Sequence, residues 1–450
     1  MNIEEKRVSE AIAVSRRRSR LSQRLRIVAT GSATAVALAA CGSTAGSANT
    51  SAKTAAVQHI SLWESHSGGP VAAAVSAMVS QFNKSHKGVQ VSINVTKAST
   101  KALAAVAAGT PPLLAEIGHY DGKFVQAHAL VDLNQFIYGK DGLSAAQRAA
   151  IWPAVWKNGM LGGKHYRLEV DAKVSEFFYN KSLFAKAGIT SMPATWTALQ
   201  ADLVKLKALG VTPLGIKDSS AHIEPIFVSN GGHLLKPGSK GKATDFNSSA
   251  GRTTFSFMRG LVQGGLAVFG HGSTLRADLA SGKMAIIDGT SAGYQKVLQS
   301  VGGKFAVGAM PYPAGTSGHS ANMVQGLGFV IMKGHPLVQE KAAWEFVKWY
   351  LAGKQQAYWA MHSGFAPETS SALKYIPSSY LSSHPGLAVS IQEVKSPYTF
   401  PRVNEQNYSE VEPALDAAYF DVLTGKQPLG PALRALDAKD HQYLTGASAI

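Results

Sequence analysis

One segment of the chain matches the sequence pattern around a catalytic serine. The segment 289–293, Gly-Thr-Ser-Ala-Gly, matches G-x-S-x-G, and it follows an expected strand and opens an expected helix. In that context Ser291 would be the exposed nucleophile of a secreted esterase or lipase-like enzyme. The other interpretation is a helix N-terminus whose N–H groups, with the hydroxyls of Thr290 and Ser291, bind an anion or a sugar hydroxyl. With 44 glycines in the chain the pattern arises easily by chance, and the downstream acids and histidines form no recognisable motif, so binding is favoured.

Two acid–histidine pairs have spacing that could suit a metal ion. Glu64 and His66 are two residues apart, as are His222 and Glu224, and each pair would point to one side of an extended chain. Isolated pairs of this kind are far more common as polar loop residues. The sequence therefore predicts neither a metal site nor a cofactor.

Several tryptophans could stack on the ring of a ligand. Trp344, Trp349 and Tyr350 recur at helical spacing, which favours packing in a core over ligand stacking. Trp63 and Trp196 stand at the ends of expected elements, and they are the better stacking candidates.

The elements that must position these residues alternate along the chain. Expected strands lie at 59–65, 89–95, 113–118, 175–180, 212–216, 283–289, 305–312 and 326–332. Expected helices lie at 71–86, 101–109, 181–188, 195–210, 250–264, 294–301 and 340–353, and near 409–423 and 430–444. Such alternation predicts parallel sheets with helices on both faces, and ligands bind beyond the carboxyl ends of the strands. Trp63, Glu64, Glu116 and His119 should meet at one such edge.

The first forty residues form an export signal. Residues 1–26 carry eight Lys/Arg against three acids, and residues 27–40 are uncharged. Because a bilayer span needs about 20 apolar residues, this 14-residue stretch is a signal-peptide core and not a membrane anchor. The last positions, Leu38 to Cys41, resemble the lipobox of bacterial lipoproteins, which implies that Cys41 carries a diacylglyceryl group. An ordinary signal cut near Ala40, with Cys41 incidental, is the alternative.

Composition limits what the remaining chain can do. Segment 41–57 is rich in Gly, Ser, Thr and Ala and is typical of a flexible tether. Roughly 390 residues follow, enough for two domains, and none of their apolar stretches is long enough to span a membrane. Loss of the signal lowers the net charge from +16 to +11, and the remaining Lys/Arg are dispersed, which argues against nucleic acid as a partner. The low number of Asp/Glu, 28, hints at an acidic exterior.

Six short segments, in order, resemble the extracellular solute-binding proteins of carbohydrate ABC importers. They are LWESHSGG from 62, YNKSLFAKAGI from 179 with PATWTAL from 193, SGKMAI from 281, VGAMPYP from 307, GLGFVI from 326 and SGFAPE from 363. The resemblance covers roughly 58–445, and the glycerol-3-phosphate-binding branch is the most similar.

The resemblance implies a fold and a domain organisation. Members have a type II periplasmic-binding-protein fold: two discontinuous α/β lobes, a hinge, and a ligand held between the lobes. The lobes expected here are 58–172 with 320–372, and 173–319 with 373–450. Crossovers are expected near 170–175, 315–322 and 370–376.

The same resemblance implies a set of ligand-binding residues. The glutamate of the glycerol-phosphate branch matches Glu116, its arginine matches Arg402, and Lys173 stands where the branch has a hydroxyl side chain. Phe365 replaces a ligand-binding tyrosine, and Ser99 with Thr100 occupy the region of another, which suggests a different solute. The resemblance implies that Arg402 clamps a phosphate or carboxylate, with Lys173 able to supply a second cation. If the solute is neutral, Arg402 instead binds hydroxyls or pairs with a nearby acid. The full predicted ligand-binding set is Trp63, Glu64, Glu116, Lys173, Thr290, Ser291, Gly326, Phe365 and Arg402.

The function implied is solute capture for an importer. The chain is expected to be a non-enzymatic, monomeric, lipid-anchored protein that binds a sugar, polyol or glycerol-phosphate-type solute and delivers it to membrane permease subunits. A secreted esterase using Ser291 and an adhesive or wall-structural lipoprotein are the alternatives.

Overall fold

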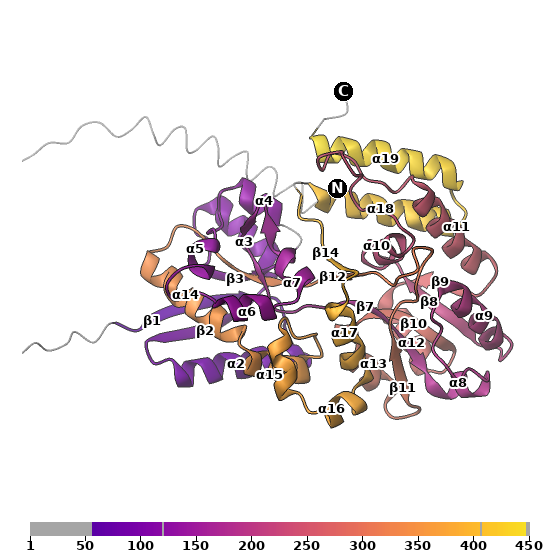
Figure 1. Ribbon diagram of the computed structural model, residues 1–450, viewed down its shortest axis with the longest axis horizontal. Helices are drawn as coiled ribbons and strands as arrows, with labels where there is room; N and C mark the ends of the chain where they lie inside the picture. Colours follow the sequence, from indigo (N-terminus) through magenta and orange to yellow (C-terminus); the bar gives the residue numbers. More distant parts are fainter. Residues whose placement is uncertain (1–55, 119–120, 406, 447–450) are drawn as a thin grey trace, which may run out of the picture.

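Two lobes, each built on a five-stranded sheet, make up the folded part of the chain (Figure 1). The computed structural model describes residues 56–118, 121–405 and 407–446. The signal and lipobox predictions, including Cys41, and the prediction for His119 lie outside the described residues. In the described part, no helix has both the length and the apolar character needed to cross a bilayer.

The first lobe has strand order β2-β1-β3-β13-β6. Its strands are β1 (Gln58–Glu64), β2 (Val89–Val95), β3 (Leu114–Ile117), β13 (Gly328–Ile331) and β6 (Leu168–Glu169). Helices α2 (Gly69–Ser85) and α14 (Leu337–Tyr350) contribute to one hydrophobic core of this lobe, and α3 (Ala98–Ala108) contributes to a separate one. In α2 the apolar residues recur at helical spacing, and Val75, Met78 and Phe82 are buried as that spacing predicts.

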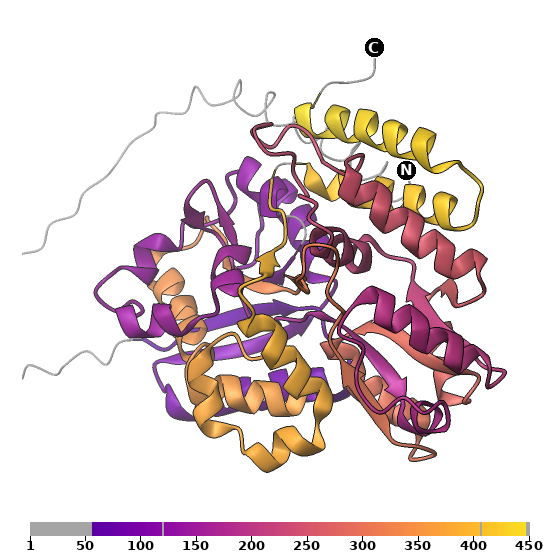
Figure 2. The ribbon, with the colours of Figure 1, turned by 45° about the vertical axis from the view of Figure 1, so that its right-hand side comes forward.

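The second lobe has strand order β11-β7-β10-β8-β9. Its strands are β7 (Ser175–Asn180), β8 (Thr212–Lys217), β9 (Ala267–Gly270), β10 (Met284–Thr290) and β11 (Val307–Met310). One core includes α9 (Trp196–Lys207), α10 (Ser220–Ser229), α11 (Ser249–Gln263), α18 (Tyr408–Leu423) and α19 (Leu429–Thr445). The other includes α12 (Gly272–Ala280) and α13 (Tyr294–Val301). Helices α11, α18 and α19 lie side by side at one end of the lobe (Figure 2).

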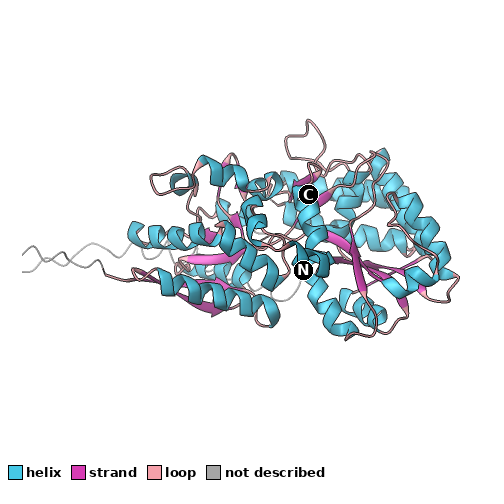
Figure 3. Cartoon of the chain, turned by 60° about the horizontal axis from the view of Figure 1, so that its bottom comes forward, coloured by secondary structure: helices cyan, strands magenta, loops and turns pink. Residues whose placement is uncertain are grey.

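Smaller elements complete the two lobes, and helices flank the strands of both (Figure 3). The helices are α4 (Asp121–Gln126), α5 (Asn134–Ile137), α6 (Ala145–Ala150), α7 (Pro153–Asn158), α8 (Lys181–Lys186), α15 (Gly353–Ser363), α16 (Ser378–Ser383) and α17 (Pro385–Lys395). The 3-10 turns are η1 (Ser291–Gly293) and η2 (Ser370–Tyr375), and the short strands β4 (Met160–Leu161) and β5 (Lys164–His165) pair with each other.

Extended segments join the lobes and form the hinge. Strand β12 (Asn322–Val324) runs parallel to β14 (Thr399–Pro401), and Lys173 forms an antiparallel bridge with Gln325. The segment near 370–376, expected to cross between lobes, is the turn η2 packed on α15. The chain contacts the second sheet later, through α17 against β11 and β7.

Both sheets are mixed, and the expectation of parallel sheets was wrong in this respect. Strand β13 runs antiparallel to β3 and β6, and β7 runs antiparallel to β10 and β11. The remaining pairs, β1 with β2 and β3 and β8 with β9 and β10, are parallel as expected. Strands β13 and β7 are the first long strands after the hinge segments. Both strands begin at the edge of their sheet that lies next to the hinge, whereas the parallel strands of the same sheet end at that edge.

The tryptophan predictions divide between the two lobes. Trp344 and Tyr350 are buried in the core of the first lobe, which confirms the packing interpretation. Trp196 is also buried, with its ring against those of Phe177 and Tyr312, so the stacking interpretation was wrong for this residue. Trp196 does stand at the end of an element, in the first turn of α9, but this turn faces the core.

A buried acid pair lies where α17 packs on β7. Glu176 is fully buried, and neither of its carboxylate oxygens has a hydrogen-bond partner within the described residues. Burial, and then the charge of Glu393, raise the pKa of Glu176 well above its ordinary value. Burial also raises the pKa of Glu393 to about 7, against an opposing hydrogen bond from Asn322. Glu176 is therefore neutral in the folded protein at pH values where the unfolded chain is ionised.

This pair predicts a fold that is more stable in acid than in base. A raised folded-state pKa contributes stability that is complete below the ordinary pKa of 4.5 and is lost as the pH rises through the folded value. The substitution Glu176→Gln removes that titration, and we expect it to stabilise the protein at pH 8 by about 2 kcal/mol or more while changing little at pH 4.5. Denaturant unfolding at the two pH values measures this. Glu345→Gln, on an exposed position of α14, is the control, and an equal effect of both substitutions would contradict the assignment.

Candidate functional site

A polar cavity of about 340 Å³ lies beside the hinge on the second lobe, and we call it the hinge cavity. Its lining residues are Lys173, Lys217, Ser219, Ser220, Ala221, His222, Thr290, Gln325, Arg402, Glu412, Pro413 and Asp416. Three of them, Lys173, Gln325 and Arg402, lie in or next to the hinge segments, and the others come from the second lobe. The cavity is thus built where relative motion of the lobes would change its shape.

Sheet topology explains why these side chains meet. Strands β8 and β10 are parallel neighbours, so their carboxyl ends, Lys217 and Thr290, share one edge of the sheet. Helix α10 begins directly after β8 and adds Ser219, Ser220 and His222 to the same edge. Helix α18 closes the cavity with its acidic residues.

Lys217 is a partly buried cation of this wall. Burial lowers the pKa of Lys217, the charge of Asp288 opposes that shift, and the charges of Lys173 and Arg276 add to it. Its Nζ atom lies 3.4 Å from Nε2 of His222. The other ring nitrogen of His222 lies 2.7 Å from the Asp288 carboxylate, so this acid is already committed to a histidine.

Arg402 reaches the cavity with its guanidinium already paired. Its Nε donates to Oε1 of Glu412 at 2.7 Å, and its Nη2 contacts the same oxygen. Its backbone N–H donates to Asn158 of the first lobe at 2.8 Å. The pairing with an acid, one of the three roles considered for Arg402, is therefore present, and the anion-clamp role stays a prediction.

A histidine surrounded by three carboxylates forms the nearest polar wall of the first lobe. This acid–histidine cluster comprises Glu64, His66, Glu116 and Asp171. Nδ1 of His66 lies 2.6 Å from Glu64 and 3.4 Å from Glu116, and its Nε2 lies 3.7 Å from Asp171. Burial opposes protonation of the ring, but the hydrogen bonds and charges of these acids outweigh it and raise the pKa of His66 to about 10. The imidazolium is therefore the stable form at neutral pH.

Adjacent parallel strands assemble this cluster, as the carboxyl-edge argument predicts. Glu64 ends β1 and Glu116 lies in β3, which pairs with β1. The backbone N–H of Ser65 donates to Glu116 at 3.3 Å, which fixes the turn that carries His66. Gly326 has a φ of +154°, and a side chain there would collide with Glu169 and Asp171. The chain reaches β13 past these acids only because residue 326 is glycine.

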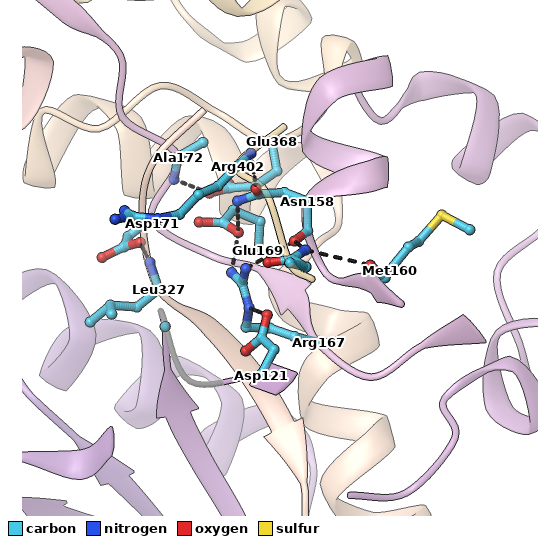
Figure 4. Close-up of polar contacts among 12 residues, drawn as sticks. Asp121, Asn158, Met160, Arg167, Glu169, Asp171, Ala172, Leu327, Glu368 and Arg402 are labelled. Atoms are coloured by element: carbon cyan, nitrogen blue, oxygen red, sulfur yellow. Dashed lines mark hydrogen bonds and ion pairs between the residues drawn. The ribbon is translucent and has the colours of Figure 1, made fainter. Parts of the chain in front are cut away.

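Behind the cluster lies a fully buried ion network (Figure 4). Nε of Arg167 donates to Asp121 at 2.8 Å, and its Nη1 contacts Glu169. Asn158 donates to Glu169 at 2.7 Å and accepts the Arg402 backbone N–H. Burial works against the charge of Arg167, but Asp121 and Glu169 raise its pKa above the ordinary value. The network joins the first lobe to the segment that carries Arg402.

Six of the nine predicted site residues lie at the hinge cavity, in the acid–histidine cluster or between the two. Lys173, Thr290 and Arg402 line the hinge cavity, and Glu64 with Glu116 belong to the acid–histidine cluster. Gly326 lies between the two sets, next to Gln325 of the cavity and against Asp171 of the cluster.

The remaining three predicted residues are packed in or against the interior. Trp63 is partly buried against a core of the first lobe. Phe365 is 3% exposed, stacks on Trp359 with ring centroids 5.6 Å apart, and meets the ring of His66 edge-on at 6.1 Å, so its ring lies between the core and the acid–histidine cluster. Ser291 is 1% exposed, and within the described residues its hydroxyl accepts from the Val174 N–H at 3.4 Å. A buried hydroxyl held this way does not fit an exposed nucleophile.

Sequence reasoning missed Lys217, Asp171, Glu412 and Asp416. Lys217 follows an expected strand, at the kind of carboxyl end that had singled out Glu64, so the same rule could have found it. Asp171 lies in an expected crossover. Glu412 and Asp416 are one turn apart on a helix, and nothing local distinguishes them from solvent-exposed acids.

Metal-binding geometry is present at one place in the described part of the chain. Ligand atoms of Glu64, His66 and Glu116 all lie within 4.8 Å of one another and could hold a divalent cation. The other suggested pair, His222 and Glu224, lies on helix α10, where residues two apart point in different directions. His222 contacts Asp288, whereas Glu224 accepts from Tyr408, so the extended-chain argument was wrong for this pair.

Comparisons with known proteins agree with this architecture. The family model described as bacterial extracellular solute-binding protein matches residues 77–388. A protein of Brucella abortus (strain 2308) named as a binding protein is 27% identical over 219 residues, 46% of this chain but only 52% of that protein, so this match spans about half of its length. The sn-glycerol-3-phosphate-binding periplasmic protein UgpB of Yersinia pseudotuberculosis is 22% identical over 407 residues, 85% of this chain and 91% of that protein.

Solved structures confirm the expected fold class. The cyclic alpha-maltosyl-1,6-maltose binding protein of Arthrobacter globiformis has a TM-score of 0.75 at 21% identity, covering 87% of this chain and 100% of that one. UgpB of Mycobacterium tuberculosis, solved with glycerophosphocholine, has a TM-score of 0.71 at 18% identity, covering 86% of this chain and 98% of that one. At these identities the likeness is evidence for the fold alone.

The acid–histidine cluster makes a prediction about stability. The raised pKa of His66 contributes stability that is complete below its ordinary value of 6.5 and is lost as the pH rises through about 10. Replacing His66 with Gln leaves three buried carboxylates without their cation, and we expect a loss of about 3 kcal/mol at pH 6 that shrinks as the pH approaches 10. Chemical denaturation across that range measures the loss. His233→Gln, at a side chain that is 62% exposed, is the control, and a pH-independent loss at His66 would count against the ion cluster.

Proposed function

This chain belongs to the family of bacterial extracellular solute-binding proteins, and we propose that it captures a sugar, polyol or glycerophosphate-type solute for an ABC importer. The observation that carries the proposal is the hinge cavity, since its walls come from the hinge segments and from the second lobe. The proteins to which the chain is similar are named for sugar or sn-glycerol-3-phosphate binding. We further propose that it acts as a monomer outside the cytoplasm and catalyses no reaction.

Lobe closure converts binding into a signal. A solute that contacts both the hinge cavity and the acid–histidine cluster gains its full set of interactions only when the lobes approach. Binding therefore favours the closed state by the free energy of the additional contacts. The permease subunits would distinguish loaded from empty protein by that closure.

The two walls offer complementary hydrogen-bonding groups. Glu64, Glu116 and Asp171 accept hydrogen bonds from hydroxyls, and protonated His66 and Lys173 donate. Hydroxyl-rich solutes present donors and acceptors on adjacent carbons and match such a mixture. The burial of Ser291 speaks against the esterase alternative.

A thermal-shift screen of the purified protein against sugars, polyols and glycerophosphodiesters tests the proposal. A solute at about 100 times its Kd should stabilise the protein by about 2.7 kcal/mol, and we expect a Kd near the micromolar range, about 8 kcal/mol of binding. Saturable shifts would exclude an adhesive or wall-structural role as the main function. No shift with any solute, together with turnover of a chromogenic ester that Ser291→Ala abolishes, would overturn the proposal in favour of the esterase.

Glu116 is predicted to bind ligand hydroxyls directly. Glu116→Gln keeps the shape of the side chain but removes its charge, and we expect solute affinity to fall about tenfold or more, since hydrogen bonds to charged groups contribute about 1.5–3 kcal/mol. Isothermal titration with the solute found by the screen measures this. Glu410→Gln, an exposed acid on α18, is the control. Unchanged affinity in Glu116→Gln would show that the residue serves only the His66 ion cluster.

Attachment to the membrane is proposed through Cys41. A diacylglyceryl group, joined to the Cys41 sulfur by a thioether bond, would hold the protein at the surface, and segment 41–57 would act as the tether. Cys41→Ser is expected to release the protein into the medium or to leave its signal uncut. Fractionation and mass spectrometry of the N-terminus measure both outcomes, and a variant that remains processed and membrane-bound would contradict lipidation.

A further inference from the structure

Two lysines of the hinge cavity form no ion pair within the described residues. Lys173 and Lys217 both line the cavity, and no described carboxylate oxygen lies within 4.0 Å of either ammonium group. The charges of Asp288 and Asp218 act favourably on the Lys217 ammonium from a longer distance, whereas those of Lys173 and Arg276 act unfavourably. The repulsion between the two lysines costs free energy, which a bound anion would reduce.

The other charged groups in this wall are already paired. Arg402 is held by Glu412 through two guanidinium nitrogens. Asp416 accepts the backbone N–H of Ser220. His222 and the hydroxyl of Tyr312 both contact Asp288. Lys173 and Lys217 are therefore the two cations of this wall that make no ion pair with a described carboxylate.

The backbone geometry adds donors next to the lysines. Helix α10 is ten residues long and begins at the cavity, with its N-terminal dipole end facing the same space. The hydroxyl of its N-cap residue, Ser219, makes no capping hydrogen bond. Thr290 contributes another hydroxyl from the neighbouring strand end.

We propose that Lys173 and Lys217 form an anion subsite that binds a phosphate or carboxylate group of the transported solute. The proposal rests on the proposed function and specifies its substrate class as anionic. It assigns anion binding to the two lysines and leaves Arg402 as a residue held by Glu412. Lysine ammonium groups are compact charges that suit phosphate oxygens, and a bound anion would relieve the repulsion between them.

The acid–histidine cluster supports the orientation of such a solute. Three acids surround the ring of His66 there, and burial raises the pKa of Asp171 well above its ordinary value, so that wall suits hydroxyls and offers an anion less than the lysines do. An anionic group would therefore lie at the lysines, with the rest of the solute directed across the hinge. The lysine side and the acid side are connected directly, because Asp171 and Lys173 are two residues apart in one hinge segment.

Matched pairs of ligands test the charge requirement. Isothermal titration would compare three pairs: glycerol 3-phosphate with glycerol, glucose 1-phosphate with glucose, and galacturonate with galactose. Glycerophosphocholine and inorganic phosphate would be titrated as single ligands. We expect an anionic member to bind at least tenfold more tightly than its neutral parent at about 50 mM salt, with a smaller difference at about 500 mM. Binding of inorganic phosphate as tight as that of any organic anion would instead identify a free anion as the ligand of the subsite.

Variants test the two lysines themselves. Lys217→Met and Lys173→Met should each weaken the anionic ligand about ten- to hundredfold and leave a neutral parent unaffected, while Lys217→Arg should retain most of the affinity. Lys205→Met, on an exposed position of α9 and paired with Asp202, is the matched control. If Lys217→Met does not fold, the affinity of Lys173→Met and the salt dependence of binding by the unmodified protein decide whether the anion subsite exists.

The possible failures are distinguishable. If neutral sugars bind as tightly as their anionic relatives, or if both methionine variants keep full affinity for an anion, the subsite is overturned while the proposed function stands. If no sugar, polyol or glycerophosphate binds at all, the proposed function fails and the subsite fails with it.

Discussion

The buried charge of Arg167 is the constraint on which the site depends. Its side chain is almost completely inaccessible, and Asp121 and Glu169 provide the two carboxylates that make such burial tolerable. Removing one partner from a buried network of this kind typically costs about 3–5 kcal/mol, so the three residues must stay together. Asn158 extends the network to the segment of Arg402. The position of that segment, and through it one side of the hinge cavity, is fixed by charges in the other lobe.

The hinge segments do two tasks with the same residues. They carry the chain between lobes, and they supply Lys173, Gln325 and Arg402 to the cavity. Gly326 allows this crowding, since any side chain at that position would collide with Glu169 and Asp171. A change in hinge angle therefore alters the cavity directly, without a separate relay. This arrangement couples solute binding to lobe movement through local geometry.

Sequence periodicity predicted most of the long helices and strands. The carboxyl-edge rule predicted that Glu64 and Glu116 meet. Both predictions succeeded because periodicity and strand ends depend on local chain geometry. The role of Trp196 could not be predicted in the same way. An aromatic residue at the end of an element looks alike whether its ring faces a cleft or a core, and only tertiary packing decides. The antiparallel strands β7 and β13 were also missed, since strand direction depends on where the chain re-enters a sheet. Lys217 was within reach of the edge rule but had no motif to draw attention to it.

The two walls near the hinge differ in the charged groups that they present, and this difference limits what they can bind. Around His66, one imidazole ring meets three acids, whereas Lys173 and Lys217 line the hinge cavity without an ion pair among the described residues. Each wall thus holds groups of like charge that are partly removed from water, and these groups repel one another. Closure would bring the solute between two walls of opposite character. A neutral group would reduce the charge repulsion in neither wall, whereas a group of complementary charge would reduce it in at least one. The proposed anionic solute fits this arrangement, because its charge would offset the repulsion between the two lysines.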